Sequence, residues 1–173
     1  AGEALPAGAS PDGRWAIPPL SVTTSDGAVL RGARFSRPDS RATVLYFGGN
    51  GLTLYRDYRF LLRIYQDLPV DVVAFDHRGY GGSSGQPTMA LLEGDGVTLY
   101  DSTRADAAHR HGPLIVHGQS MGSFVAGHLA SARKLDGLVL ESSATTAEDW
   151  VQGFIDNSPW YVRAFMRVRI DPA

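Results

Sequence analysis

The sequence predicts an α/β fold, with a mostly parallel, twisted β-sheet and helices on both of its faces. From Thr43 onward, short apolar runs rich in β-branched residues alternate with longer stretches of helical pattern, which is typical of parallel βαβ units. Two of these apolar runs end directly in glycine-containing turns that lead into a helix. The length of 173 residues allows one domain with a sizeable core.

The first part of the chain differs in composition from the rest. Residues 1–19 are rich in Ala, Gly and Pro and are expected to form an extended lead-in, so that the domain itself spans residues 20–173. Two β-like runs between Ser21 and Ser36 flank the turn sequence Ser25-Asp26-Gly27, which predicts a hairpin.

After the hairpin, each predicted strand ends in a turn. The predicted elements are, in order, strand Thr43–Phe47, helix Thr53–Gln66, strand Val72–Phe75, strand Pro113–His117, helix Met121–Arg133 and strand Gly137–Glu141. Functional loops of α/β sheets lie at the carboxyl ends of the parallel strands. We therefore expect the turns that follow these strands to meet at one edge of the sheet.

One turn carries the pattern Gly-x-Ser-x-Gly, as Gly118-Gln119-Ser120-Met121-Gly122. This spacing is that of a nucleophile elbow, in which a sharp strand-to-helix turn strains the serine and raises its hydroxyl above the sheet edge. The residues on either side crowd each other, so only glycine, which lacks a Cβ, fits there. The pattern predicts that Ser120 is the attacking group of a hydrolase. The alternative is an ordinary strand–turn–helix in which Ser120 is a buried capping residue.

A second turn, Gly48-Gly49-Asn50-Gly51, follows the strand that ends at Phe47. Acyl transfer builds negative charge on a carbonyl oxygen and needs N–H donors aimed at that oxygen, and glycines let a backbone approach a substrate closely. The alternatives are a plain turn or a phosphate-binding loop. A dinucleotide fingerprint fails because Leu54 stands where a third glycine is required, and a P-loop fails because the chain has no Gly-Lys-Ser/Thr.

In this order and separation, the two turns resemble those of the α/β-hydrolase superfamily, in its small serine-hydrolase branch of esterases and peptidases. The stretch from Asp76 to Ser83 looks like the Asp-x-Arg-Gly-x-Gly-x-Ser loop that follows the fourth strand in that branch. The run Gly137–Ser143 looks like the sixth strand and its exit, so the resemblance extends from about Val22 to Glu141. Asp76 and Arg78 are expected to brace the loops rather than to do chemistry.

The resemblance implies acyl chemistry that needs no cofactor and no metal. Ser120 would attack a carboxylic ester, thioester or amide through an acyl-enzyme, and the backbone amides of Met121 and Asn50 would hold the oxyanion. Gly48 stands where the family commonly has His. An esterase is favoured over a peptidase, because ester leaving groups ask least of the general acid. A non-catalytic binding protein or an inactive fragment of this fold is the alternative, and a nucleotide-binding βαβ domain is a weaker one.

A serine nucleophile needs a base, normally a histidine held by a carboxylate. The resemblance implies the chain order Ser, then Asp or Glu, then His, yet no histidine follows His128. The fold is therefore expected to be C-terminally incomplete, with strands seven and eight, the acid and the base beyond Ala173. That part would be absent, removed or on another polypeptide, unless the chain is a truncated, inactive product. Glu141 is a second candidate for the acid, because some lipases place it after the sixth strand.

The five histidines have other expected roles. His77 is expected to be structural, and His117 to form a local hydrogen bond. His109 and His111 are expected to be solvated at the polar end of a helix, with a metal role as the alternative. His128 falls in the helix after Ser120. None of the five histidines therefore stands where the base is expected.

The segment 146–169 is rich in aromatic residues. Trp150 and Phe154 would share one helix face, and Ser158-Pro159 is typical of a helix start. This segment is interpreted either as a small cap that lines an apolar acyl pocket or as helices packed on the sheet.

Composition narrows the partners to a small-molecule or acyl substrate. The net charge of −2 gives no electrostatic case for nucleic acid or an anionic membrane. The 43% hydrophobic content is ordinary for a soluble globular protein, and no stretch approaches the ~18 apolar residues of a membrane span. Cysteine is absent, which removes thiolate chemistry and disulfides. Compartment and oligomeric state stay open.

Overall fold

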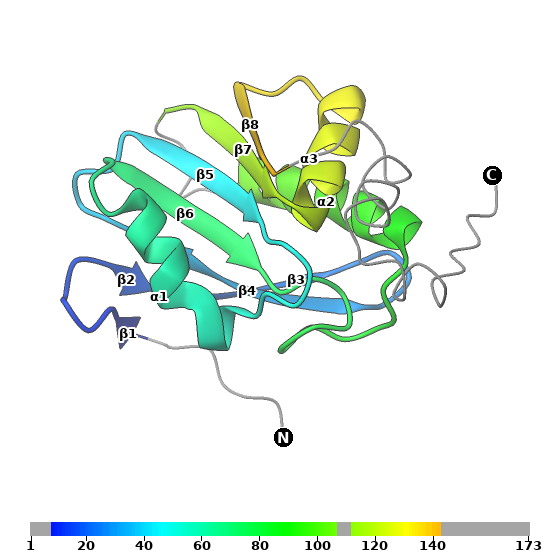
Figure 1. Ribbon diagram of the computed structural model, residues 1–173, viewed down its shortest axis with the longest axis horizontal. Coiled ribbons are helices and arrows are strands. Elements are labelled where there is room, and N and C mark those ends of the chain that lie inside the picture. The colour runs from blue at the N-terminus through cyan, green and yellow to red at the C-terminus, as the bar shows by residue number, and fades with distance from the viewer. Residues whose placement is uncertain (1–7, 107–111, 143–173) are drawn as a thin grey trace, which may run out of the picture.

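Six strands form one twisted sheet in the order β3-β4-β6-β5-β7-β8 in the computed structural model, which describes residues 8–106 and 112–142 (Figure 1). The strands are β3 (Pro19–Thr23), β4 (Val29–Phe35), β5 (Ala42–Phe47), β6 (Val70–Phe75), β7 (Leu114–Gln119) and β8 (Gly137–Glu141). β3, β4 and β6 pair antiparallel, whereas β6, β5, β7 and β8 run parallel. The predicted hairpin and the mostly parallel sheet are confirmed.

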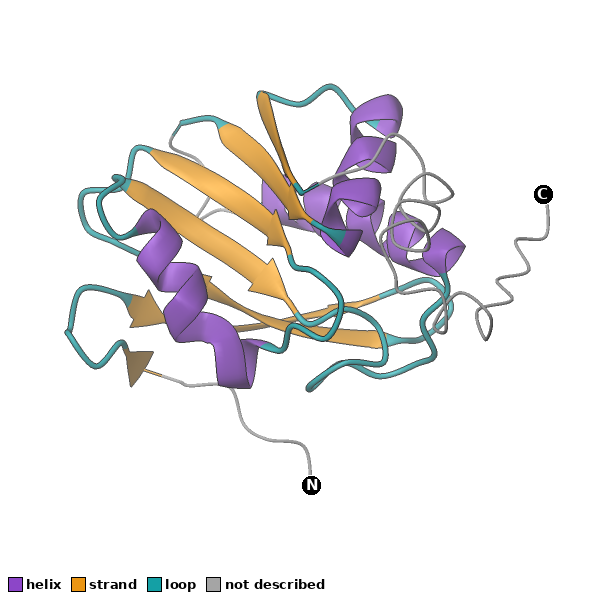
Figure 2. Ribbon diagram, viewed as in Figure 1, coloured by secondary structure: helices purple, strands orange, loops and turns teal. Residues whose placement is uncertain are grey.

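Helices cover both faces of this sheet, as predicted (Figure 2). On one face lies α1 (Leu54–Tyr65), and on the other lie α2 (Met89–Ala105) and α3 (Met121–Ala132). The helix α1 buries Leu54, Leu61, Leu62 and Tyr65, which recur at helical spacing and so share one side of the helix. The ends of α1 and α3 agree with the predicted ends to within one residue.

Two hydrophobic clusters, one on each side of the sheet, make up the core. Successive strand residues alternate between them, as the strand period requires: in β5, Leu45 and Phe47 face α2 and α3, whereas Val44 and Tyr46 face α1. The central strands are therefore buried on both sides, and their carboxyl ends converge on one edge. That edge carries the two turns singled out from the sequence.

Residues 8–17 differ from the extended lead-in that the composition predicts for residues 1–19. Here β1 (Gly8–Ala9) and β2 (Ala16–Ile17) pair antiparallel. Trp15 and Ile17, which are 2% and 0% exposed, pack into the cluster on the α1 side. Burial of these two side chains joins the segment to the domain. A Trp or Ile removes a large apolar area from water, and this stabilises the packed arrangement. Residues 1–7 lie outside the described part of the chain.

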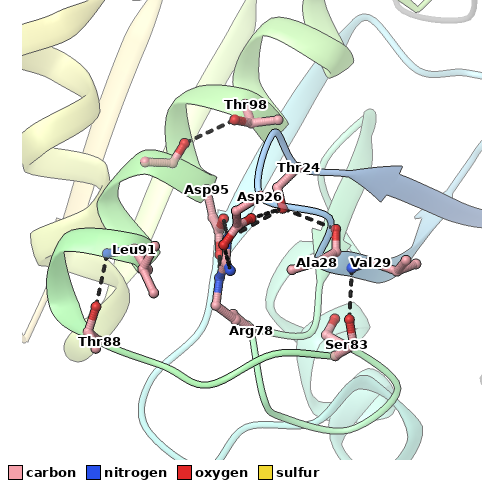
Figure 3. A network of polar contacts seen from close by, with 12 residues as sticks. Thr24, Asp26, Ala28, Val29, Arg78, Ser83, Thr88, Leu91, Asp95 and Thr98 are labelled. Carbon is pink, nitrogen blue, oxygen red and sulfur yellow. Dashed lines mark hydrogen bonds and ion pairs between the residues drawn. The ribbon is translucent and has the colours of Figure 1, made fainter.

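The loop Asp76–Gly85, which follows β6, is held by two buried charged groups. The Asp76 carboxylate accepts hydrogen bonds from the amide of Leu54 at the start of α1 (2.7 Å) and from the amide of Gly82 (2.9 Å). Arg78 donates to Asp26 in the β3–β4 turn and, in a bidentate pair, to Asp95 on α2 (2.9 and 2.6 Å; Figure 3). The expectation that Asp76 and Arg78 brace the loops is confirmed.

Among the described residues the sheet ends at β8. Leu138, Val139 and Leu140 on this edge strand are 40–46% exposed, in contrast to the buried β5 and β7. The described sheet has six strands, β3 to β8. The strands that would follow β8 as the seventh and eighth of this sheet are not among the described residues.

Candidate active site

Ser120 occupies the turn between β7 and α3 in a strained backbone conformation, with φ 51° and ψ −120°. A positive φ is uncommon for a residue with a Cβ and persists only where the surroundings enforce it. Here the Ser120 amide donates to the carbonyl of Glu141 (2.8 Å), and the Ser120 carbonyl accepts from the amide and hydroxyl of Ser123 (2.8 and 2.6 Å). The half-buried Ser120 side chain makes no capping hydrogen bond, which argues against the capping-serine alternative.

The two glycines of this elbow (residues 118–122) are enforced by close backbone contacts. A Cβ added to Gly118 would lie 2.4 Å from the carbonyl oxygen of Gly122. A Cβ added to Gly122 would lie 2.1 Å from the carbonyl oxygen of Phe47, at the end of β5. The crowding predicted from the sequence is present, but the neighbour of Gly122 is the adjacent strand. The elbow therefore packs directly against the strand that leads into the glycine turn (residues 48–51).

This packing brings the glycine turn beside the elbow. A Cβ built on Gly49 would lie 3.3 Å from the Cβ and 3.9 Å from the Oγ of Ser120. A hydrogen bond from the Leu52 amide to the Gly49 carbonyl (3.2 Å) closes the turn, and Asn50 is exposed at its tip. Met121 is the first residue of α3, where amide groups have no partner within the helix. The structure thus brings the turn that contains Asn50 beside Ser120 and Met121, through Gly49.

The three described histidines all have partners other than Ser120. The Nε2 of buried His77 bonds to the Gly48 carbonyl (2.8 Å), so His77 is structural, as expected. His117 bonds through Nδ1 to the Tyr65 hydroxyl (2.5 Å), whereas exposed His128 lies 3.7 Å from a Glu93 oxygen. Within residues 8–106 and 112–142, no histidine bonds to the Ser120 hydroxyl, and His109 and His111 lie outside these ranges.

Glu141, the last residue of β8, takes part in a polar cluster behind the elbow. Its carboxylate accepts a hydrogen bond from the Gln119 side chain (3.2 Å) and lies 3.3 Å from the Nε2 of His117. Gln119 in turn accepts from the hydroxyl of Tyr46 (2.7 Å). Burial raises the pKa of Tyr46 to about 12. Sequence reasoning missed this cluster, because tyrosines on an apolar strand and helix read only as core residues.

Acidification is expected to destabilise the protein below about pH 6.5. Burial lowers the pKa of both His77 and His117 below its usual value, so the unfolded chain binds protons more readily than the folded one. Their contribution to stability is full above the unfolded pKa and is lost as the pH falls through the lower folded values. Urea midpoints between pH 8 and 5 measure this loss, and H117F should flatten the dependence. The variant H128Q, at an exposed site, should leave it unchanged, and an equal slope in all three proteins would contradict this explanation.

Among the described side chains, no group of three or more Asp, Glu or His residues gathers to hold a metal ion. The helices described are too short or too polar to cross a membrane. Cavities of about 230 and 300 Å³ lie away from Ser120, beside α1 and beside the end of α2. The cap or packing helices predicted for residues 146–169 lie outside the described residues.

The sheet order, the helices on both faces and the strained serine after a central parallel strand define the class: the molecule has the α/β-hydrolase fold. The family model of the serine aminopeptidases, S33, matches residues 39–170. The chain therefore belongs to this family of α/β hydrolases.

Two curated proteins and one solved structure are similar to this chain. The lysophosphatidylserine lipase ABHD12 of Danio rerio is 33% identical over 118 residues, which cover 64% of this chain and 30% of the relative. Protein bem46 of Schizosaccharomyces pombe is 30% identical over 116 residues, covering 66% of this chain and 39% of bem46. The Pyrococcus furiosus esterase Pf2001 shares the fold, with a TM-score of 0.64 at 17% identity over 96% of this chain and 66% of the esterase. The chain thus spans about a third of the length of these curated relatives.

Proposed function

We propose that this chain carries the nucleophile and the oxyanion hole of a serine hydrolase that acts on carboxylic esters. The observation that carries the proposal is the position of the strained Ser120, with its Oγ 3.9 Å from the place that a Gly49 Cβ would take. A serine hydroxyl at a strand-to-helix elbow beside a glycine-rich turn is the geometry that acyl transfer requires.

In this proposal Ser120 Oγ bonds to the substrate carbonyl carbon while a base takes the hydroxyl proton. The carbonyl oxygen becomes an oxyanion and accepts hydrogen bonds from the amides of Met121 and Asn50. The N-terminal end of the α3 dipole adds favourable positive potential at the same place. The bond to the leaving group then breaks while the base returns its proton to the leaving oxygen, so that an alcohol departs. Water, deprotonated by the same base, then attacks the acyl-serine, which releases the acid and restores the serine hydroxyl. The proposal assigns no base among the described residues.

The relatives favour esters over amides as substrates. One curated relative is named a lysophosphatidylserine lipase, and a structural neighbour is an esterase. The description of the family as serine aminopeptidases keeps an amide as the nearest variant. Esters are also the easier substrates chemically, because an alkoxide leaving group needs less help from a general acid than an amine.

A second candidate function is non-catalytic binding on the same fold. It is favoured by one observation, namely that no described histidine bonds to the Ser120 hydroxyl. The two candidates differ in one measurable property, the reactivity of Ser120.

A fluorophosphonate probe tests the proposal, because it phosphonylates only serines with an activated hydroxyl. Where the base is present, we expect one labelled serine, Ser120 by peptide mass mapping, with loss of the label in S120A and retention in S131A, whose hydroxyl is exposed on α3. In a parallel experiment, S120C should be acylated by p-nitrophenyl acetate at least 10-fold faster than S131C, because a helix N-terminus lowers a thiol pKa and removes the need for a strong base. A chain that neither labels at Ser120 nor shows this difference would contradict the proposal and favour the binding protein.

A further inference from the structure

The loop Asp76–Gly85 touches the glycine turn at two points. The Gly48 carbonyl accepts a hydrogen bond from His77 (2.8 Å), so the Nε2 of this imidazole carries the proton. The Tyr80 hydroxyl donates to the Oδ1 of Asn50 (2.7 Å). The rings of His77 and Tyr80 pack edge to face, with centroids 6.3 Å apart. His77 therefore holds Gly48, the first residue of the turn, and Tyr80 holds Asn50, the third.

The glycine turn has few restraints of its own. Besides the Leu52–Gly49 hydrogen bond, the Gly51 carbonyl accepts a bond from the exposed Arg56 side chain (2.6 Å). Three of the four residues in the turn are glycines, which have the largest conformational freedom of any residue. A turn of this kind does not fix the direction of an amide without contacts from outside.

The loop that makes these contacts is firmly anchored. Its first residue, Asp76, is buried and bonded to the start of α1, and the Arg78 side chain is tied to α2 and to the β3–β4 turn. Ser83 Oγ donates to the Asp76 carbonyl (2.7 Å) and accepts from the Arg31 amide on β4 (2.9 Å). A backbone bond from Tyr80 to His77 (2.9 Å) links the two contact residues. The loop Asp76–Gly85 thus has more described hydrogen bonds to the rest of the fold than the glycine turn that it contacts.

We propose that His77 and Tyr80 are positioning residues, which fix the glycine turn so that the Asn50 amide is aimed at the oxyanion before a substrate arrives. This inference rests on the proposed function, in which Asn50 supplies one of the two oxyanion donors. Donors that are already oriented need no reorganisation during the reaction, which is the source of their catalytic effect. A turn released by loss of Tyr80 or His77 would have to be ordered in the transition state at a cost in rate.

The variant Y80F tests the proposal, because it removes only the hydroxyl that reaches Asn50. The matched control is Y55F, which removes the hydroxyl of an exposed tyrosine on α1. We expect the ¹⁵N order parameters of Gly49 and Asn50 to fall in Y80F and to stay unchanged in Y55F. The maximal rate of Ser120 phosphonylation should fall about 10-fold, with little change in the probe concentration for half-maximal rate, since removal of a whole oxyanion donor costs roughly 100-fold or more.

His77 is buried, so its replacement is judged by a pair of variants rather than by one. H77L removes the donor to Gly48, whereas H77Q keeps an N–H donor. Both variants lose the aromatic packing with Tyr80, so a purely structural role predicts equal loss of order and rate in the two. Positioning predicts that H77Q restores both readouts toward those of the unchanged protein.

The two proposals fail in different ways. Absence of Ser120 reactivity would overturn the proposed function, whereas unchanged order parameters of Gly49 and Asn50 in Y80F would overturn the positioning role. A loss of order without any fall in phosphonylation rate, in a protein that labels at Ser120, would also overturn positioning. A joint loss of order and rate in Y80F, absent from Y55F, supports it.

Discussion

Replacement of Arg78 by Met is expected to destabilise the fold by about 3–5 kcal/mol, the range found when one partner of a buried ion pair is removed. The Arg78 side chain is 4% exposed and its partner Asp95 is 7% exposed. Without the guanidinium, the Asp95 carboxylate keeps its burial and loses both of its hydrogen bonds to Arg78. Asp26 is 47% exposed, so water can solvate its carboxylate when Arg78 is lost. In the folded protein, the hydrogen bond from Arg78 holds the pKa of Asp26 well below its usual range. Urea unfolding of R78M measures the loss.

A surface pair of the same geometry supplies the control. Arg133 also forms a bidentate pair, with Asp101 at 2.9 and 2.8 Å, but its side chain is 41% exposed. R133M should cost far less stability than R78M, because water and salt screen exposed pairs. The double variant R78M/D95L should recover much of the loss, since no uncompensated carboxylate remains. A double variant as unstable as R78M would show that Asp95 is not the source of the effect.

Replacement of Gly122 by Ala is expected to cost about 3 kcal/mol or more, at the upper end of the range for overpacking. The added Cβ would meet the backbone carbonyl oxygens of Phe47 and Gly48, at 2.1 and 2.7 Å, and backbone atoms cannot move aside as a flexible side chain can. To relieve these contacts, α3 must move away from the end of β5. G122A is therefore expected to lose fluorophosphonate labelling at Ser120 as well as stability, and thermal unfolding and labelling measure the two losses.

The control for this prediction is on the same helix. Gly127 has nothing within 4 Å of an added Cβ, so G127A should stabilise the protein by up to about 1 kcal/mol through helix propensity. If G122A unfolds at the same urea concentration as G127A, the close packing of the elbow against β5 is contradicted.

The elements that the sequence predicts best are those whose pattern is local. The turn Ser25-Asp26-Gly27 between two β-like runs predicts a hairpin, and β3 and β4 pair around it. The elbow glycines predict a strained serine, and Ser120 has φ 51°. The N-terminal segment has no such local pattern. Its composition predicts an extended lead-in, yet Trp15 and Ile17 pack against residues of α1 and β4 far along the chain, which no local pattern reveals.

The candidate site also has residues that the sequence identifies and contacts that only the structure reveals. The sequence singles out Ser120, Met121 and Asn50 by motif and by resemblance, and their roles as nucleophile and oxyanion donors stay a prediction. The role of His77 beneath Gly48 could not be found in this way, because the two residues come from separate loops and meet only when β5 and β6 pair. Likewise, the contact of Tyr80 with Asn50 depends on how Asp76 and Arg78 anchor the intervening loop.

The sequence by itself determined the α/β class, the order of the sheet strands and of α1 and α3 along the chain, and the identity of the strained serine. Each of these follows from hydrophobic period and turn chemistry within a few neighbouring residues. Only the tertiary structure decided which strands lie side by side beyond the hairpin, that Gly122 packs against Phe47 and that the loop Asp76–Gly85 holds the glycine turn. These contacts join residues tens of positions apart, and their geometry is set by packing of the whole sheet and its helices, so it leaves no mark on a short stretch of sequence.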